Sequence, residues 1–233
     1  YLINDAMPSD RGENYYQAFF DRDKILSSGN VDMRTGRGST LIYNLHETDL
    51  VLRHYRRGGL YGRLIKDSFL LFEKHARRAE EEFRLLEHLQ SLALPVPEPV
   101  IARISRNSLF ITQDLVIKKI PDSYDLAYIL HQRPLDPDEY ALIGSMLRSF
   151  FAHGLHHTDL NLRNILINSK KKAFLIDFDK CFIENMHSEL KVRMLNRLKR
   201  SFNKEKLLSE RDGKGYFFDE KGFEILKSQA LLK

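Results

Sequence analysis

A chain of 233 residues, of which 42% are hydrophobic and 30% charged, has the composition of a globular protein and is long enough to bury a substantial core. No apolar run reaches the length needed to span a bilayer. The single cysteine, Cys181, excludes an internal disulfide and paired-cysteine metal sites, which favours a reducing, cytoplasmic setting. The formal net charge of +5 favours anionic partners, and a nucleotide, a nucleic acid and an acidic membrane all meet that condition.

The first half of the chain is rich in predicted strands. Four runs have the pattern of strands, and they cover residues 41–45, 50–54, 100–104 and 108–112. Between the second and the third, apolar spacings of three and four predict a helix from Asp67 to about Ser91, capped by Asp67 or Ser68. Gly36 and Gly38 precede the first strand and would let the backbone approach phosphates, although a lone GxG is by itself more typical of a plain hairpin turn.

The second half is predicted to be mainly helical. Three helices are expected there, over residues 122–130, 136–154 and 188–209, and the last is basic and amphipathic. Asp122 or Ser123 would cap the first helix and Asp136 the second, which Gly154 would end.

This division predicts an α+β fold with two lobes and a cleft between them. The strand-rich lobe covers residues 1–115 and the helical lobe covers residues 116–233, and together they form one domain. Basic residues cluster from Arg53 to Arg78 and from Lys191 to Lys206. Each cluster is either a solvated face or a surface for an anionic partner.

The most informative stretch lies in the second half. Asp159 and Asn164 stand in a polar segment, and two short apolar runs separated by a basic turn lead from Asn164 to Asp177. If the runs form a tight pair of strands, both ends of the segment meet at one place. Two carboxylates and an amide gathered there can position a hydroxyl and Mg²⁺, which is what phosphoryl transfer requires.

Two of these segments resemble protein-kinase motifs. Residues 157–164, HTDLNLRN, are similar to the catalytic loop H-R-D-L-x-x-x-N, and residues 177–179, DFD, are similar to the D-F-G element. The resemblance implies that Asp159 accepts or orients the proton of the acceptor hydroxyl, and that Asn164 and Asp177 bind Mg²⁺ bridging the ATP phosphates. It also implies a small bilobal fold, with an antiparallel-sheet N-lobe and a reduced helical C-lobe.

The same resemblance implies an ion pair in the first lobe. Arg53 would stand where the family places a lysine on its third strand, and Glu82 would be its partner. An arginine can serve there because its guanidinium makes bidentate contacts with carboxylate and phosphate. Arg56 competes with Arg53 for the phosphates, a plain surface charge remains the other reading of Arg53, and Glu80 and Glu81 stand beside Glu82.

Two further segments would complete the ATP site. Gly36 and Gly38 would line the loop that covers the phosphates. The segment from Gln113 to Leu115 would form the hinge, whose backbone would meet the adenine.

Departures from the protein-kinase pattern are also informative. Thr158 replaces the arginine that reads a phosphorylated activation loop, Asp179 replaces the glycine of D-F-G, and no A-P-E follows. The chain has little sequence left after this point for a peptide-binding subdomain, so we expect a small or lipid-linked acceptor. His156 and Asn161 could contact it, and Arg163 could contact it or brace the loop.

The resemblance is closer to the 3-deoxy-D-manno-octulosonic acid (Kdo) kinases, which are relatives of the lipopolysaccharide core heptose kinases. It rests on LRHYRRGGL at residues 52–60, ITQDL at residues 111–115 and HHTDLNLRNIL at residues 156–166. It implies transfer of phosphate from ATP, with Mg²⁺, to the 4-hydroxyl of Kdo on lipid A. It also implies a peripheral location at the cytoplasmic side of the inner membrane, where the basic segments would meet anionic lipid.

Three alternatives stay open from the sequence. The first is a heptose kinase of the same pathway, the second a small atypical protein kinase, and the third an inactive, membrane-binding pseudokinase, which Arg53 in place of lysine would favour. No aromatic and basic recognition motif supports a nucleic-acid partner.

Overall fold

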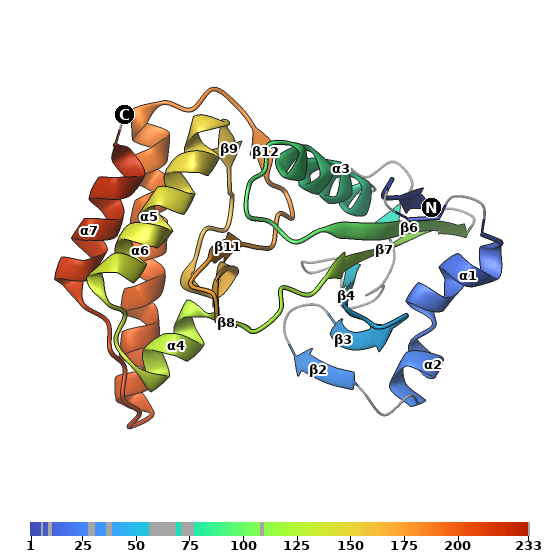
Figure 1. The fold of residues 1–233 in the computed structure, drawn as a ribbon, viewed down its shortest axis with the longest axis horizontal. Coiled ribbons are helices and arrows are strands. Elements are labelled where there is room, and N and C mark those ends of the chain that lie inside the picture. The colour runs from blue at the N-terminus through green and yellow to red at the C-terminus, as the bar shows by residue number, and fades with distance from the viewer. Residues whose placement is uncertain are drawn as a thin grey trace. The chain divides into compact units, whose positions relative to one another are not determined.

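A computed structural model describes residues 1–5, 7–8, 11–27, 31–35, 39–55, 69–70, 77–107 and 110–232 (Figure 1). Helices and antiparallel sheets both occur, which confirms the predicted α+β class. The chain divides into two compact units: the first comprises Tyr1–His88 and Pro97–Lys119, and the second comprises Leu89–Val96 and Ile120–Lys233.

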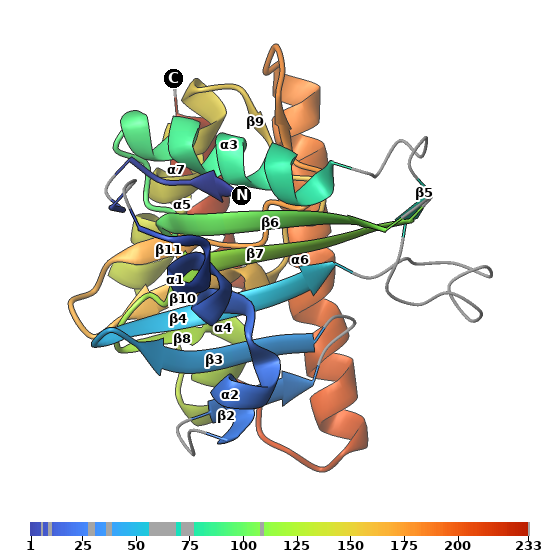
Figure 2. The same ribbon diagram turned by 90° about the vertical axis from the view of Figure 1, so that its right-hand side faces the viewer.

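The first unit is built on an antiparallel sheet. Among the described residues, seven strands take part, in the order β1-β6-β7-β4-β3-β2 with β5 beside β7 (Figure 2). They are β1 (Leu2–Ile3), β2 (Val31–Thr35), β3 (Ser39–Leu45), β4 (Thr48–Tyr55), β5 (Phe69–Leu70), β6 (Pro99–Asn107) and β7 (Phe110–Lys118). The four strands predicted in this half correspond to β3, β4, β6 and β7.

Short helices near the N-terminus cover part of this sheet. They are α1 (Glu13–Gln17), the 3-10 helix η1 (Ala18–Phe20) and α2 (Arg22–Ser27). Phe19 and Phe20 are buried in one cluster with Leu41, Leu50 and other alternating residues of β3 and β4. Because alternate strand residues point to the same face, this cluster accounts for the two-residue periodicity of the two strands.

The sheet centre also carries a row of polar side chains. His54, Asp114 and Arg103 stand opposite one another on β4, β7 and β6. Asp114 is 2.6 Å from His54 Nδ1 and accepts two hydrogen bonds from Arg103, at 2.7 and 3.0 Å. Burial alone would raise the pKa of Asp114, but these two partners outweigh it and the pKa is lowered. The row is a satisfied structural network.

Two helix starts differ from the predictions. Phe69–Leu70 forms β5 against β7, so no helix runs through these residues, and α3 covers Arg78–Ser91. The caps expected at Asp67 or Ser68 lie outside the described residues. The second difference is that Ser123–Asp125 forms the strand β8, and Asp125 caps α4 (Leu126–Gln132) by accepting a hydrogen bond from the Tyr128 N–H. Asp122 has a positive φ of 50°, whereas an N-cap residue needs an extended backbone.

The second unit contains helices and two small sheets. The helices are α4, α5 (Pro137–Ala152), α6 (Ser188–Arg211) and α7 (Glu220–Leu231), with the 3-10 helix η3 (Leu162–Asn164). One sheet has the order β11-β10-β8 and the other pairs β12 with β9. The remaining strands are β9 (Leu155–His156), β10 (Ile165–Asn168), β11 (Ala173–Leu175) and β12 (Phe182–Ile183). Among the described helices, none is both long and apolar enough to cross a membrane.

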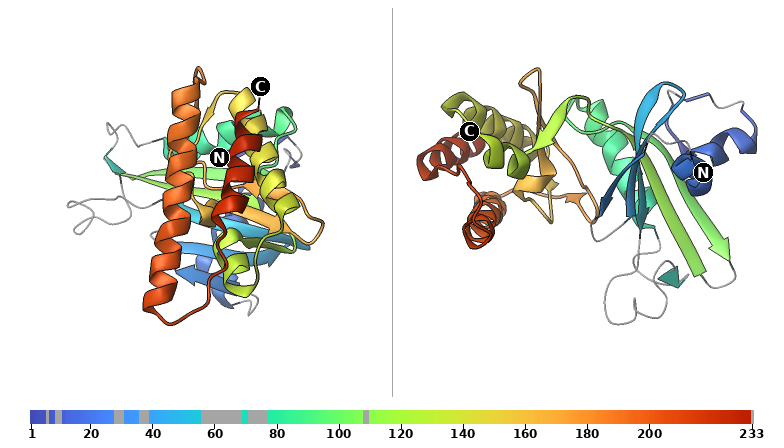
Figure 3. Two further views of the ribbon diagram at one scale, coloured as in Figure 1. Left: turned by 90° about the vertical axis from the view of Figure 1, so that its left-hand side faces the viewer. Right: turned by 90° about the horizontal axis from the view of Figure 1, so that it is seen from below.

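The predicted start and end of α5 are confirmed. Asp136 and Glu139 form a capping box, with Pro137 in the first turn. Gly154 follows the helix with a φ of 75°, a left-handed conformation that glycine adopts without strain. Figure 3 shows α5, α6 and α7 side by side in this unit, with α7 packed closely on α5.

The segment Leu89–Val96 belongs to the second unit although most of α3 belongs to the first. Leu94 and Val96 are buried, and the Leu175 N–H donates a hydrogen bond of 3.0 Å to the Pro95 carbonyl. The segment that follows α3 is thereby attached to β11.

Candidate active site

The strands β10 and β11 bring the two ends of the informative stretch together. They pair antiparallel with Ile165 opposite Leu175, and the Ile176 N–H donates a hydrogen bond of 2.9 Å to the Asn164 carbonyl. Asp177 is the next residue along the chain. The predicted hairpin is therefore confirmed, and it carries Asn164 and Asp177 at the same end.

A buried histidine holds the carbonyl group of Ile176, the residue before Asp177. His157 is 2% exposed, and its Nε2 lies 3.1 Å from the Ile176 carbonyl. A carbonyl only accepts, so Nε2 carries the proton. Among the described residues Nδ1 has no hydrogen-bond partner. Burial lowers the pKa of His157, and the Ile176 carbonyl, Asp177 and Asp159, which act in the opposite direction, do not outweigh it. The ring is therefore a neutral structural support.

Phe178, the residue after Asp177, is buried against His157. It is 1% exposed, and its ring meets the His157 ring edge-on at a centroid distance of 5.4 Å. It also lies 6.3 Å from the ring of Phe150 on α5. Asp177 itself has a φ of 66°, which is unusual for a residue with a side chain and is found at sites where the surroundings hold the backbone in place. The hydrogen bonds on both sides of Ile176 provide that support.

The loop before the hairpin is folded around one carbonyl. The Asp159 carbonyl accepts hydrogen bonds from Asn161 Nδ2, at 2.9 Å, and from Asn164 Nδ2, at 3.0 Å. Because the amide nitrogen of Asn164 donates to this carbonyl, its Oδ1 is directed away from the carbonyl. The Asp159 side chain is 63% exposed, and its Oδ1 lies 3.3 Å from Arg197 Nη1 on α6. The carboxylate is therefore accessible to a reactant from solution.

Helix α6 holds this loop through residues one turn apart. Ser201 Oγ accepts a hydrogen bond of 3.0 Å from the Leu162 N–H. Both carboxylate oxygens of Glu205 accept from Arg163 Nη2, at 2.7 and 2.9 Å. With Arg197, these residues repeat every fourth position on one side of the helix. Arg163 therefore braces the loop, which is one of the two roles predicted for it.

A Mg²⁺ ion bound with nucleotide phosphates fits these residues. Mg²⁺ is held in proteins by one or two carboxylates, with phosphates and water as its other ligands. Asp177 would supply a carboxylate, and Asn164 would supply an amide oxygen, since its amide nitrogen is engaged by the Asp159 carbonyl. Within the described ranges no group of three or more His, Cys, Asp or Glu residues could hold a metal ion.

The predicted ion pair of the first unit is present. Arg53 Nη1 on β4 donates to Glu82 Oε1 on α3, and Glu82 is 2% exposed. Glu81 is exposed and Glu80 pairs with Arg84, so the choice of Glu82 among the three adjacent glutamates is confirmed. The Tyr55 hydroxyl donates to the other oxygen of Glu82.

Gln113 has a different place from the one predicted. Gln113 and Leu115 lie inside β7, paired with β4 on one side and β6 on the other. Backbone groups in a central strand are used by its two neighbours, so this segment is not a hinge. After β7 the chain passes from the first unit to the second between Lys119 and Ile120. The buried Gln113 side chain accepts a hydrogen bond of 3.0 Å from the Ala79 N–H and thereby fixes the first turn of α3.

Comparison with known proteins agrees with this geometry. A sequence model of the lipopolysaccharide kinase (Kdo/WaaP) family matches residues 25–215, which include the catalytic-loop segment and the hairpin. The chain belongs to this family. Members of the Kdo/WaaP family are kinases, so the phosphotransferase class predicted from the sequence is confirmed.

Individual relatives cover most of the chain. The 3-deoxy-D-manno-octulosonic acid kinase of Vibrio cholerae serotype O1 is 42% identical over 182 residues, which are 78% of this chain and 75% of the relative. The protein of the same name from Photobacterium profundum is 40% identical over 190 residues, with 81% and 80% covered. The one from Haemophilus influenzae strain PittGG is 35% identical over 215 residues, with 88% and 87% covered.

Some predicted site residues could not be located, and some observed ones were not predicted. Gly36, Gly38 and Arg56 lie outside the described residues. His156, which was expected to be near the acceptor, lies 2.5 Å from Glu184 through its Nδ1. The sequence interpretation missed Tyr55 and the three α6 residues that hold the loop. A spacing of four between Arg197, Ser201 and Glu205 was the available signal, and it was hidden by the many other polar residues of this helix.

Proposed function

We propose that this member of the Kdo/WaaP family transfers the γ-phosphate of ATP to the 4-hydroxyl of Kdo on Kdo-lipid A, in lipopolysaccharide inner-core synthesis. The hydroxyl oxygen forms a bond to the γ-phosphorus, the bond to the β-bridging oxygen breaks, and ADP leaves. The hydroxyl proton passes to a carboxylate. The observation that carries the proposal is the hairpin that places Asn164 and Asp177 together beside the Asp159 loop. The relatives named as Kdo kinases support the acceptor.

Four site residues of the second unit have a role in this proposal. Asp159 orients the acceptor hydroxyl and receives its proton, for which its exposed carboxylate is suited. The Asn164 amide oxygen and the Asp177 carboxylate hold Mg²⁺, which would neutralise charge on the phosphates when bound. His157 keeps the segment before Asp177 in place without carrying charge.

In the first unit, Arg53 takes the role of the strand lysine and contacts the ATP phosphates. Glu82 and Tyr55 orient it, since both oxygens of the buried carboxylate are engaged. A guanidinium keeps its charge when partly buried and forms paired hydrogen bonds with phosphate oxygens. Arginine at this position is therefore compatible with an active kinase, and we do not favour the pseudokinase alternative.

The proposal includes a location at the cytoplasmic side of the inner membrane, in peripheral contact with it. A lipid-linked acceptor requires the enzyme to work at a membrane surface, and the net charge of +5 favours an anionic one. Each Lys or Arg near such a surface contributes roughly 1 kcal/mol, so a few suffice for reversible binding.

Mass spectrometry of Kdo-lipid A incubated with the protein, ATP and Mg²⁺ tests the reaction. We expect a product that carries one added phosphate, with fragmentation placing it on the 4-hydroxyl of Kdo. The Asp159→Ala variant should lose about 10²–10⁴-fold in turnover, as expected for removal of a general base, while it still binds ATP. Asp138→Asn, which changes an exposed carboxylate of α5, is the control and should retain activity.

Other results would point elsewhere. Near-normal turnover of the Asp159→Ala variant would contradict the role of this residue. Preference for a heptose-extended acceptor would indicate a heptose kinase, and label transfer to protein would indicate a protein kinase. Absence of ATP turnover with all these acceptors would contradict the proposed activity.

A further inference from the structure

One face of α6 carries a continuous row of cations. Arg193, Arg197, Arg200, Lys204 and Arg211 are separated by three, four or seven residues, and all five are exposed. These spacings return to the same side of a helix. The row, called the cationic stripe below, extends about 27 Å at 1.5 Å per residue. No acidic residue lies on this side of the helix between its ends.

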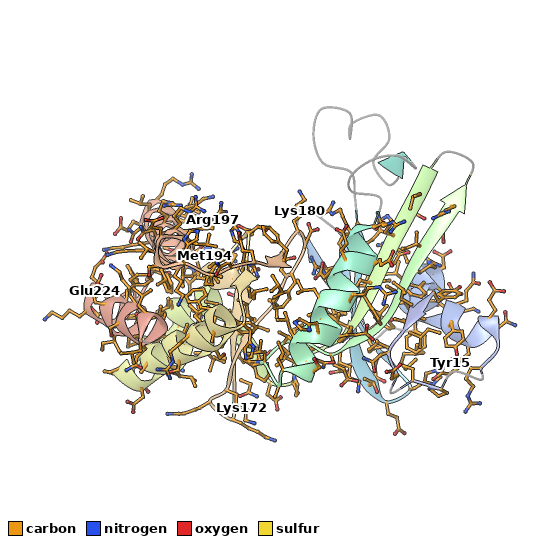
Figure 4. All side chains as sticks on the ribbon, turned by 90° about the horizontal axis from the view of Figure 1, so that it is seen from above. Tyr15, Lys172, Lys180, Met194, Arg197 and Glu224 are labelled. Carbon is orange, nitrogen blue, oxygen red and sulfur yellow. The ribbon has the colours of Figure 1, made fainter. Side chains whose placement is uncertain are left out.

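The opposite side of α6 faces the second unit. Leu190, Met194, Leu195, Leu198 and Phe202 are buried there. Figure 4 marks Arg197 and Met194, which lie on the exposed and the buried side of this helix. The stripe is therefore held rigidly, because the buried side anchors the helix over its whole length.

Most of the stripe has no internal partner. Arg197 lies 3.3 Å from Asp159, and Arg211 lies 3.3 Å from its neighbour Asp212. In the part of the chain that the structure describes, no carboxylate lies within ion-pair distance of Arg193, Arg200 or Lys204. These three cations, which have no carboxylate partner within the described fold, are available to an external anion.

The stripe passes directly beside the catalytic loop. Arg197 contacts the carboxylate of Asp159. On the adjoining side of the helix, Ser201 binds the Leu162 backbone N–H and Glu205 binds the Arg163 side chain. The pair between Arg197 and Asp159 is exposed on both sides, at 50% and 63%. Exposed ion pairs are weak, so an incoming anion can replace Asp159 as the partner of Arg197.

We infer that the cationic stripe of α6 is the docking surface for the anionic headgroup of the lipid-linked acceptor, with Arg197 at the position nearest the reacting hydroxyl. The inference rests on the proposed function. An acceptor whose sugar carries a carboxylate and whose lipid carries phosphates presents several anions, which an extended row of cations can bind together. As a carboxylate of the acceptor engages Arg197, Asp159 is released to face the hydroxyl.

The one apolar residue of this face supports a lipid rather than a soluble anion. Leu207 is 66% exposed and lies between Lys204 and Arg211 on the same side of the helix. Cations that surround an exposed leucine are typical of helices that lie at a membrane interface. A soluble nucleotide or sugar phosphate would not require it.

Vesicle binding and steady-state kinetics together test this inference. The stripe variant Arg193→Gln/Arg200→Gln/Lys204→Gln removes three cations and leaves Arg197 in place. The control variant Lys170→Gln/Lys172→Gln/Lys214→Gln removes three exposed cations elsewhere in the same unit, and Figure 4 shows Lys172 well away from Arg197. Both should show the circular dichroism and thermal unfolding of the wild type.

Binding is measured without ATP, on phosphatidylglycerol vesicles with and without Kdo-lipid A and on phosphatidylcholine vesicles. We expect the stripe variant to bind anionic vesicles at least about tenfold more weakly, since surface cations act roughly additively. The difference should shrink at high salt because exposed charges are screened. With Kdo-lipid A in vesicles, its acceptor KM should rise by a similar factor, while kcat and the KM for ATP stay within about twofold.

Equal losses in the stripe and control variants would show an effect of net charge alone and would overturn the inference. Unchanged vesicle binding and an unchanged acceptor KM in the stripe variant would also overturn it, even if the wild-type protein phosphorylates Kdo-lipid A. A self-association of the protein that the stripe substitutions abolish would overturn it as well. If vesicle binding depends on the stripe but the wild-type protein leaves Kdo-lipid A unmodified, the docking surface is supported and the proposed reaction is contradicted.

Discussion

At the residue scale, His157 links the stability of the site to pH. Burial lowers its pKa below the ordinary value of 6.5, whereas in the unfolded chain the pKa returns to that value. Below about pH 6.5 the unfolded state therefore binds a proton that the folded state does not. The contribution of neutral His157 is fully present above pH 6.5 and is lost as the pH falls towards the lowered value.

This predicts a pH-dependent loss of stability that one substitution removes. We expect the unfolding free energy to fall below pH 6.5 with a slope of at most about 1.4 kcal/mol per pH unit from this residue. His157→Gln keeps a donor for the Ile176 carbonyl and should flatten the profile, whereas His153→Gln, at an exposed position, should not. Urea unfolding at several values between pH 5 and 8 measures the slopes. An unchanged slope in His157→Gln would show that another group is responsible.

At the element scale, two glycines allow the close packing of α5 and α7. A Cβ on Gly144 would lie 2.3 Å from the Leu226 carbonyl oxygen, and a Cβ on Gly222 would lie 2.1 Å from the Tyr140 ring. Since a backbone oxygen cannot move aside as a flexible side chain does, the helices themselves would have to separate at Gly144. Further along α5, Phe150 and Phe151 are buried, and Phe150 lies 6.3 Å from the ring of Phe178 in the catalytic segment.

Gly144→Ala should therefore destabilise the protein. Alanine favours an isolated helix by up to about 1 kcal/mol relative to glycine, but overpacking costs about 1–3 kcal/mol, and more where backbone is the obstacle. We expect a net loss of about 1–3 kcal/mol and a drop of several degrees in Tm, measured by calorimetry. Gly215→Ala is the matched control, because nothing lies within 4 Å of its added Cβ. A neutral Gly144→Ala would mean that these helices can separate without cost.

Elements were predictable from sequence where local chemistry decides them. The capping residues of α5 are local, and its start was predicted correctly. The pairing of Phe69–Leu70 with β7 joins residues far apart in sequence, so no local pattern contained it. In the same way, an apolar spacing of three and four predicted helix continuously from Asp67, while the tertiary pairing of β5 overrides that preference.

At the scale of the whole molecule, the reacting groups were predictable and their supports were not. A short hairpin forces Asn164 and Asp177 together, so their proximity follows from sequence. The contacts of Ser201 and Glu205 depend on how α6 packs against the loop. The hinge was misplaced because the predicted strand ended before the polar residues Gln113 and Asp114, whereas β7 continues through them to Lys118. Tertiary partners satisfy both buried side chains, and no local pattern contained those contacts.

Ligand linkage provides a test of the metal site through the stability of the entire protein. A ligand that binds only the folded state stabilises it by RT ln(1 + [L]/Kd), which is about 2.7 kcal/mol at a hundredfold excess over Kd. We expect ATP with Mg²⁺ to raise the unfolding free energy by about this amount, and ATP with EDTA to raise it less, because the phosphates then lack the ion held by Asn164 and Asp177.

Comparing the two increments within each variant removes any direct effect of a substitution on the fold. In Asp177→Asn the increment due to Mg²⁺ should vanish, whereas the exposed Asp138→Asn should keep it. Thermal and urea unfolding at fixed ATP concentration measure both increments, and an undiminished increment in Asp177→Asn would place the ion on other residues.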